Sequence, residues 1–252
     1  MRSRYPSSTS NFASSFGPGP VTPAIKAIMI ANVAAFLVAL IVPAITLAFG
    51  LRPADVFGSF HVWQIVTYMF LHGGIFHILF NMLALWMFGT ELERVWGTRF
   101  FLKFYFITGI GAGCLTVLLS LFSFGPLRQL YMSDIIGASG AVYGLLLAYG
   151  IYFPKRPIYM YFVFPIPARI FVLIMGAIAF FSSMSESGGG VANATHLGGL
   201  LVAYLYLKGA RFKLNPWAEV KYRYIKWKIN RVRKKFDVYS GGKNDEWNRR
   251  VH

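Results

Sequence analysis

Long apolar runs separated by short polar connections dominate the chain. A helix of about 20 apolar residues crosses a bilayer core of about 30 Å, and six runs are candidates for such a span. They cover residues 24–49, 76–89, 101–122, 138–153, 170–184 and 191–207. The second, fourth and fifth are short, so these helices need flanking residues or begin below the membrane surface. The pattern predicts an all-α polytopic membrane protein built as a six-helix bundle.

The segment 51–71, between the first two runs, has a mixed character. Phe57, Phe60 and Val62 occur among Gly, His, Gln and Asp, which is too apolar for a solvated loop and too broken for a spanning helix. Trp63 and Tyr68 suit the headgroup level, where amphipathic rings are enriched. We therefore expect an outer loop between helices 1 and 2 that is partly embedded in the membrane as an interfacial hairpin.

Composition supports a membrane protein. Of the 252 residues 56% are hydrophobic and 13% are charged, against about 25% charged residues in soluble domains. The formal net charge is +16, but fourteen of the 25 Lys and Arg residues lie from Lys208 onward. The excess charge therefore belongs to a tail, and nucleic-acid binding is not the favoured interpretation. Cys114 is the only cysteine, which excludes an intrachain disulfide and a Cys-type metal site; no cofactor is expected.

The distribution of basic residues predicts the orientation of the bundle. Cytoplasmic loops carry an excess of Lys and Arg, and the outer loops of this chain hold only Arg52 and Arg128. An even number of spans with both termini cytoplasmic accounts for this bias. The inner segments hold Arg2, Arg4, Lys26, Arg94, Arg99, Lys103, Lys155, Arg156, Arg169 and the basic tail.

The two ends differ in composition from the membrane domain, residues 24–207. Residues 1–23 are rich in Ser, Gly and Pro, lack the pattern of a secretory signal, and are expected to form a disordered cytoplasmic lead. Residues 208–252 form a basic tail in which Ile225, Ile229, Val232 and Phe236 fall on one helical face. An amphipathic helix on the anionic inner leaflet is expected, held by about 1 kcal/mol per charge. Binding of RNA or an acidic partner is the open alternative.

Two polar residues open apolar runs near the outer side. Ser139 begins the fourth run and His196 the sixth; a serine hydroxyl needs an adjacent base to act as a nucleophile. Gly137, Gly140 and the pair Gly198–Gly199 flank them, and small residues allow helices in membranes to approach closely. The two side chains could then lie within hydrogen-bond reach. The alternative is that Gly-Ala-Ser-Gly is a packing seam with an inert serine.

Three further residues belong to the predicted site: two at the same level of the membrane, and one on the same helix face as Ser139. His77 and Asn81 are spaced i, i+4 on one helix face and can donate hydrogen bonds to an oxyanion; a polar contact between helices is the alternative. Tyr143 follows Ser139 by one turn and could pack on His196, or could belong to the core. Because no acidic residue lies at this level inside a span, the pattern favours a Ser-His dyad.

These residues together resemble the rhomboid family of intramembrane serine proteases over residues 63–206. The resemblance rests on four motifs in the family's order, which are strong only in combination. They are His72-Gly-Gly-Ile-Phe-His77-Ile-Leu-Phe-Asn81, Glu91-Leu-Glu93-Arg94-Val-Trp-Gly97, Gly137-Ala-Ser139-Gly140-Ala-Val-Tyr143-Gly144 and Ala194-Thr-His196-Leu-Gly-Gly199.

The resemblance implies specific roles. Ser139 is then the nucleophile, His196 the general base, His77 and Asn81 oxyanion donors, and Tyr143 the ring that stacks on the base. Glu93 and Arg94 would be a cluster that supports the fold. The family's outer loop often carries Arg after Trp, where this chain has Gln64.

The implied substrates are single-pass transmembrane proteins that enter sideways, often near span five, and are cut near the outer side of the bilayer. A silent rhomboid-like protein that binds membrane helices is the alternative. A transporter or channel ranks last, because the polar residues cluster near one side of the bundle. The lead and the short loops favour a bacterial inner membrane.

Overall fold

The computed structural model describes residues 17–122, 125–160, 164–184 and 190–212. Its main compact unit extends to Leu207, and a second unit begins at Lys208. Most of the expected lead and the expected amphipathic helix of the tail, with Ile225 and Phe236, lie outside the described residues.

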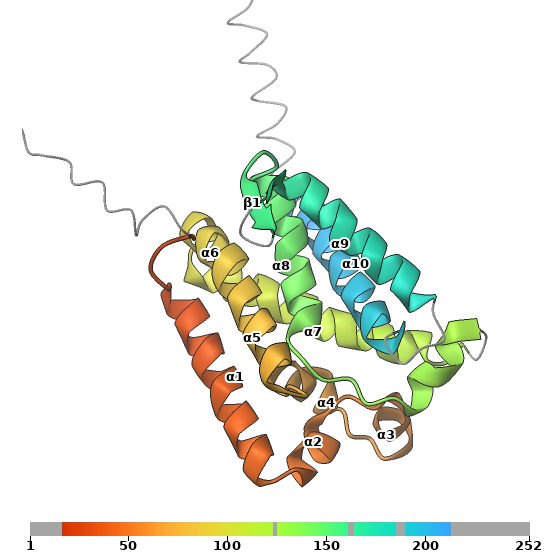
Figure 1. The fold of residues 1–252 in the computed structure, drawn as a ribbon. Coiled ribbons are helices and arrows are strands. Elements are labelled where there is room, and N and C mark those ends of the chain that lie inside the picture. The colour runs from red at the N-terminus through yellow and green to blue at the C-terminus, as the bar shows by residue number, and fades with distance from the viewer. Residues whose placement is uncertain (1–16, 123–124, 161–163, 185–189, 213–252) are drawn as a thin grey trace, which may run out of the picture. The chain divides into compact units, whose positions relative to one another are not determined.

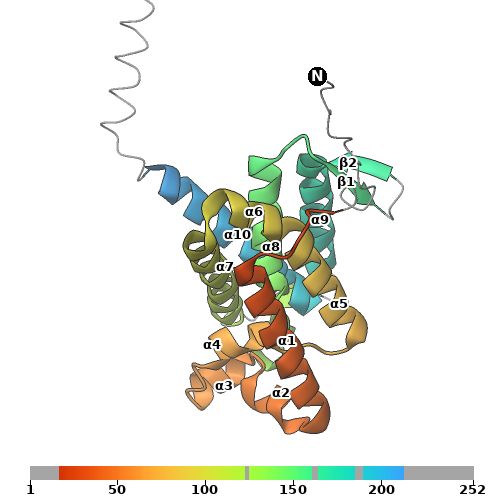
Figure 2. The same cartoon turned by 90° about the vertical axis from the view of Figure 1, so that its left-hand side faces the viewer.

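Helices make up most of the described chain, and α8 lies in the middle of the bundle in both views (Figure 1, Figure 2). The short helices α2, α3 and α4 gather at one end, and the strands lie at the other. The elements are α1 (Pro23–Ile41), α2 (Ala44–Phe49), α3 (Pro53–Gly58), α4 (Gln64–Thr67), η2 (Tyr68–Phe70), α5 (Ile75–Ala84), η3 (Leu85–Gly89), α6 (Thr90–Trp96), α7 (Thr98–Leu119), η4 (Gly125–Met132), α8 (Ser139–Tyr152), β1 (Pro157–Met160), β2 (Phe164–Pro167), α9 (Ala168–Ser183) and α10 (Gly190–Phe212).

Three of the described helical segments are long and apolar enough to cross a membrane. They are Pro23–Ile41, Ile75–Trp96 and Thr98–Leu119, and α8 and α9 are shorter apolar helices. The protein is therefore a helical membrane protein, as predicted, whereas the count of six spans stays a prediction. The first expected span, 24–49, is divided: α1 ends at Ile41, and α2 begins after Pro43, whose ring removes a backbone donor and clashes with the preceding turn.

The second spanning segment is longer than the expected run 76–89, because α5 continues through the π-helical turn η3 into α6. In an uninterrupted helix of 3.6 residues per turn, Asn81 and Glu93 would point about 120° apart. A π turn absorbs one extra residue, which reduces this angle to about 20°. Both side chains are consequently buried, with exposed fractions of 7% and 3%. One helix thus presents polar groups to the core at both of its ends.

The outer loop is not the expected hairpin. Residues 51–71 form α3, α4 and η2 instead, because Pro53 can begin a short helix and consecutive local hydrogen bonds follow Trp63. A hairpin occurs elsewhere: β1 and β2 pair antiparallel between α8 and α9, with Ile158 opposite Ile166. The sequence analysis did not predict these strands.

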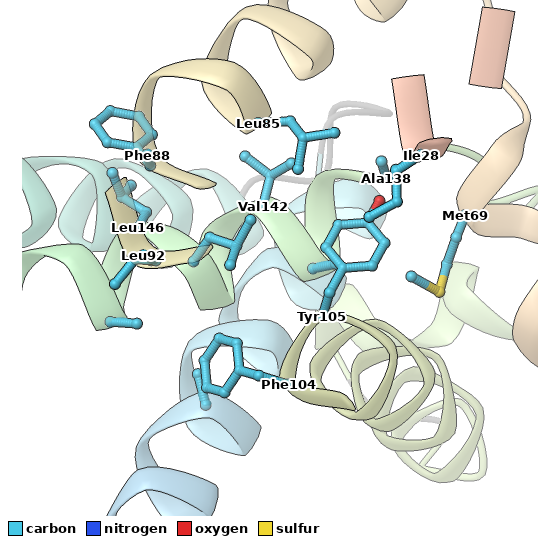
Figure 3. Packing of buried hydrophobic residues seen from close by; sticks show 14 of the residues in the cluster. Ile28, Met69, Leu85, Phe88, Leu92, Phe104, Tyr105, Ala138, Val142 and Leu146 are labelled. Carbon is cyan, nitrogen blue, oxygen red and sulfur yellow. The ribbon is translucent and has the colours of Figure 1, made fainter. Parts of the chain in front are cut away.

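The core around α8 consists of interlocking apolar side chains (Figure 3). Leu85, Phe88 and Leu92 pack with Val142 and Leu146 of α8. In a membrane, helices gain little from leaving lipid, so close van der Waals packing supplies the attraction. Glycines and alanines on α7 and α8 allow this, since a Cβ on Gly144 would lie 2.9 Å from Thr108 Cβ.

A buried carboxylate joins α6 to the start of α1. Glu93 accepts hydrogen bonds from the Thr22 hydroxyl, the Ala24 and Ile25 amides at 3.0 and 3.2 Å, and the Thr98 hydroxyl at 2.7 Å. The first amides of a helix lack partners within it, so a carboxylate from another helix satisfies them and meets the positive end of the helix dipole. The interaction anchors α1 to the bundle.

We expect Glu93→Ala to lower the free energy of unfolding by about 1–3 kcal/mol, since it leaves buried donors without an acceptor. Thermal unfolding in detergent measures the effect. Glu91→Gln is the matched control: Glu91 pairs with the half-exposed Arg156 at 2.8 Å, and such a pair contributes about 0–1 kcal/mol. Equal losses in the two variants would contradict the role assigned to Glu93.

Candidate active site

The chain enters α8 through a position that only glycine can occupy. Gly137 has φ +122°, a conformation that glycine adopts without steric cost, and its amide donates to the Tyr68 carbonyl at 2.9 Å. A Cβ at this position would lie 2.7 Å from His77 Nε2 and 3.7 Å from Ser139 Oγ. Gly137 therefore keeps open the space between these two polar groups.

Ser139 and His196 form a hydrogen bond across two helices. Ser139 Oγ lies 2.8 Å from His196 Nε2, and His196 Nδ1 lies 3.3 Å from Asn193 Oδ1. In the tautomer with its proton on Nδ1, the imidazole donates to Asn193 and accepts from the serine hydroxyl. Such an imidazole can take the hydroxyl proton, which is how a serine becomes a nucleophile.

Tyr143 covers the imidazole. Its ring lies parallel to that of His196, with 4.3 Å between ring centroids and 6° between the planes. Because Tyr143 and Ser139 share α8, the same helix supplies the hydroxyl and the surface on which the imidazole rests. This contact restricts rotation of the His196 side chain.

Close contact between α8 and α10 sets the distance between Ser139 and His196. A Cβ on Gly199 would lie 2.0 Å from the Gly140 carbonyl oxygen, so any larger residue would push the helices apart. Next to His196, Thr195 Oγ1 lies 2.9 Å from Thr116 Oγ1 of α7. Three helices thereby fix the position of the imidazole.

His77 and Asn81 occupy one face of α5, as expected. The Gly73 amide donates to His77 Nδ1 at 3.3 Å, so the neutral ring carries its proton on Nε2, the atom next to Gly137. Asn81 donates one amide hydrogen to the His77 carbonyl at 2.9 Å, a bond within its own helix. The second amide hydrogen of Asn81 and the His77 Nε2–H are the donors available to an incoming oxygen.

His72 precedes α5 and lies against His77, with 5.0 Å between ring centroids. Burial, and next the neighbouring His77, lower the pKa of His72 to about 4. The imidazole is therefore neutral at pH 7, which leaves the surroundings of His77 without an added positive charge.

Asn193 is a site residue that was not predicted from the sequence. It lies three residues before His196, and i, i+3 neighbours share a helix face, so the spacing could have indicated it as the partner of Nδ1. An amide oxygen here occupies the place that a carboxylate takes in a triad. Among the described residues, no group of three or more His, Cys, Asp or Glu side chains could hold a metal ion.

Comparison with known proteins places this chain among relatives of one kind. A family model described as "Rhomboid domain" matches residues 59–210. Rhomboid protein 1, mitochondrial, of Saccharomyces cerevisiae is 33% identical over 144 residues, which are 57% of this chain and 40% of that protein. Rhomboid protease GluP of Bacillus subtilis is 34% identical over 154 residues, 61% of this chain and 27% of that protein.

A third relative, Rhomboid protease AarA of Providencia stuartii, is 30% identical over 154 residues, 57% of this chain and 54% of that protein. The matches thus span from about a quarter to about half of these relatives.

We expect Gly199→Ala to reduce covalent labelling of Ser139 by a fluorophosphonate, a probe for activated serines. The added methyl group separates α8 from α10, and a misplacement of about 1 Å can cost about 10²-fold in rate. Gly176→Ala is the control, because its Cβ would make only an ordinary 3.5 Å contact with Leu200. Normal labelling of Gly199→Ala would contradict the importance of this contact.

We expect Asn193→Ala to slow the labelling about fivefold, the effect of losing one hydrogen bond of about 1 kcal/mol. Asn193→Asp keeps an acceptor for Nδ1–H and should label at least as fast as the unchanged protein. The labelling rate measured against pH separates this role from loss of folding, since only a change at the base alters the shape of the profile. Identical pH profiles for all three proteins would argue against the assignment.

Proposed function

This chain belongs to the rhomboid family, and on that premise we propose that it is an intramembrane serine endopeptidase with a Ser139–His196 dyad. The observation that carries the proposal is the 2.8 Å hydrogen bond between Ser139 Oγ and His196 Nε2. A protein that only binds membrane helices has no need to hold a hydroxyl against an unprotonated imidazole nitrogen. The stacked Tyr143 and the hydrogen bond to Asn193 support the same conclusion.

The proposed reaction begins with attack of Ser139 Oγ on the scissile carbonyl carbon. His196 Nε2 takes the hydroxyl proton and then gives it to the leaving amine, which produces an acyl-enzyme. A water molecule, deprotonated by His196, hydrolyses this ester and releases Ser139.

The oxyanion of each tetrahedral intermediate needs preorganised donors. We assign this role to His77 Nε2–H, the free amide hydrogen of Asn81 and the backbone N–H of Ser139 at the start of α8. The space that Gly137 leaves open beside His77 is where the oxygen would lie, because a Cβ there would approach both His77 Nε2 and Ser139 Oγ.

The proposed substrates are single-pass transmembrane proteins. A peptide bond within an intact helix is shielded from a nucleophile, so the substrate must unwind near the outer side of the bilayer. Six spans with both termini cytoplasmic, and lateral entry near α9, belong to this proposal. The protein resides in a membrane; the matched relatives include mitochondrial and bacterial proteins, and a bacterial inner membrane is the location we propose from the short loops.

We expect Ser139→Ala and His196→Ala each to reduce cleavage of a reporter transmembrane segment by at least about 10³-fold, with normal accumulation in the membrane. Ser183→Ala is the matched control, since the Ser183 hydroxyl donates to the Phe180 carbonyl of its own helix. Mass spectrometry of the purified proteins with the reporter measures the products.

Undiminished cleavage by either variant would overturn the proposed dyad. Absence of cleavage and of fluorophosphonate labelling in the unchanged protein, together with retained capture of the reporter segment, would instead support the silent binder.

A further inference from the structure

The segment that leads into α8 is tied to the outer loop by main-chain hydrogen bonds. Leu51 and Ile135 form an isolated antiparallel bridge, in which each amide donates to the other's carbonyl at 2.9 Å. Both side chains are buried, with exposed fractions of 0% and 5%. In Figure 1 this segment runs from η4 along the short helices of the outer loop before it enters α8.

A bidentate ion pair lies beside this bridge. Arg52 Nε is 2.7 Å from Asp134 Oδ1, and Arg52 Nη2 is 2.8 Å from Asp134 Oδ2. Two parallel bonds between a guanidinium and a carboxylate fix orientation as well as distance. The side chains are 32% and 45% exposed, so the pair adds little to the stability of the whole protein.

The backbone of Arg52 is held by a buried side-chain amide. Gln64 has an exposed fraction of 0%; its Oε1 accepts the Arg52 backbone N–H at 3.1 Å, and its Nε2 lies 3.4 Å from the Ala48 carbonyl. The outer loop therefore offers Asp134 a guanidinium whose backbone cannot shift freely. Gln64, which stands where the family's outer loop often carries Arg, thus supports the position of Arg52.

The aspartate end precedes the proposed nucleophile by five residues in the chain. Three residues after Asp134, the Gly137 amide bonds the Tyr68 carbonyl at 2.9 Å, and the Tyr68 hydroxyl bonds the Gly109 carbonyl at 2.7 Å. Gly137 sets the gap beside His77, and Ser139 begins α8 two residues later. A displacement of the backbone at Asp134 would change the positions of the backbone N–H and Oγ of Ser139, because only a short stretch of chain separates the two residues.

We propose that Arg52 and Asp134 are positioning residues for Ser139. We call the ion pair and the Leu51–Ile135 bridge the outer clasp. It holds the entry to α8 from the outer side, while the contact between α8 and α10 holds the serine from within the bundle. The inference rests on the proposed protease activity, but it predicts a structural effect that is measurable without a substrate.

The test compares full-length variants in proteoliposomes with a reporter transmembrane substrate. Asp134→Asn and Arg52→Gln should each reduce kcat about 10- to 100-fold, as expected for a misplacement approaching about 1 Å, with KM and Tm close to those of the unchanged protein. Arg52→Lys keeps the charge but loses the two parallel guanidinium hydrogen bonds. Its kcat should therefore lie between that of Arg52→Gln and that of the unchanged protein. The exchange of charges in Arg52→Asp with Asp134→Arg should recover part of kcat.

The matched control is Arg156→Gln, which breaks another partly exposed pair, Arg156–Glu91 at 2.8 Å, at the inner end of the bundle. It should leave kcat unchanged. Raising the salt concentration from about 0.05 to about 0.5 M shortens the screening length severalfold, and should lower kcat of the unchanged protein more than that of Asp134→Asn.

Hydrogen–deuterium exchange distinguishes failure of the clasp from failure of the proposed function. The amides of Leu51, Ile135 and Gly137 should exchange about two- to fivefold faster in Asp134→Asn than in Arg156→Gln, because opening of this segment no longer has to break an ion pair of up to about 1 kcal/mol. Unchanged exchange and unchanged kcat in Asp134→Asn overturn the inference. If the unchanged protein neither cleaves nor labels but exchange is faster in Asp134→Asn, the outer clasp is supported and the proposed protease activity is contradicted.

Discussion

The site depends on how closely α8 and α10 approach each other. A Cβ on Gly199 would lie 2.0 Å from the Gly140 carbonyl oxygen, so the two backbones touch where the sequence has only glycine. Because helices in lipid gain little from apolar burial alone, such backbone contact is a main source of their attraction. The same contact places an imidazole against a hydroxyl, and it therefore contributes to stability and to chemistry at once.

A polar site within a membrane bundle also needs its donors aimed before a substrate arrives. In both His77 and His196 a nearby residue of the chain engages Nδ1: Gly73 donates to Nδ1 of His77, and Asn193 accepts from Nδ1 of His196. The remaining Nε2 atoms have opposite roles, one as a donor and one as an acceptor. Local hydrogen bonds to neighbours in the chain thus determine which imidazole can donate to an oxyanion and which can accept from a hydroxyl in the proposed reaction.

Sequence alone predicted the helical membrane fold and an arrangement with Ser139, His196, His77 and Asn81 at one level. It could do so because glycine clusters and isolated polar groups in apolar runs carry meaning in a bilayer. The π turn η3 has no comparable local signal, since tertiary packing decides where a helix absorbs an extra residue. The Arg52–Asp134 pair joins residues 82 positions apart, and only the folded outer loop brings them together.

Different interactions anchor the two ends of the bundle. At the inner end, the buried Glu93 has no competing solvent, so its hydrogen bonds to the start of α1 carry a large part of the local stability. At the outer end, the Arg52–Asp134 pair is partly exposed, and water and salt weaken it. In the proposed function a substrate helix enters near the outer side, which would require a site that can move slightly there. The strong hydrogen bonds of Glu93 and the weaker, oriented Arg52–Asp134 pair would thus combine a stable bundle with local mobility at the proposed entry side.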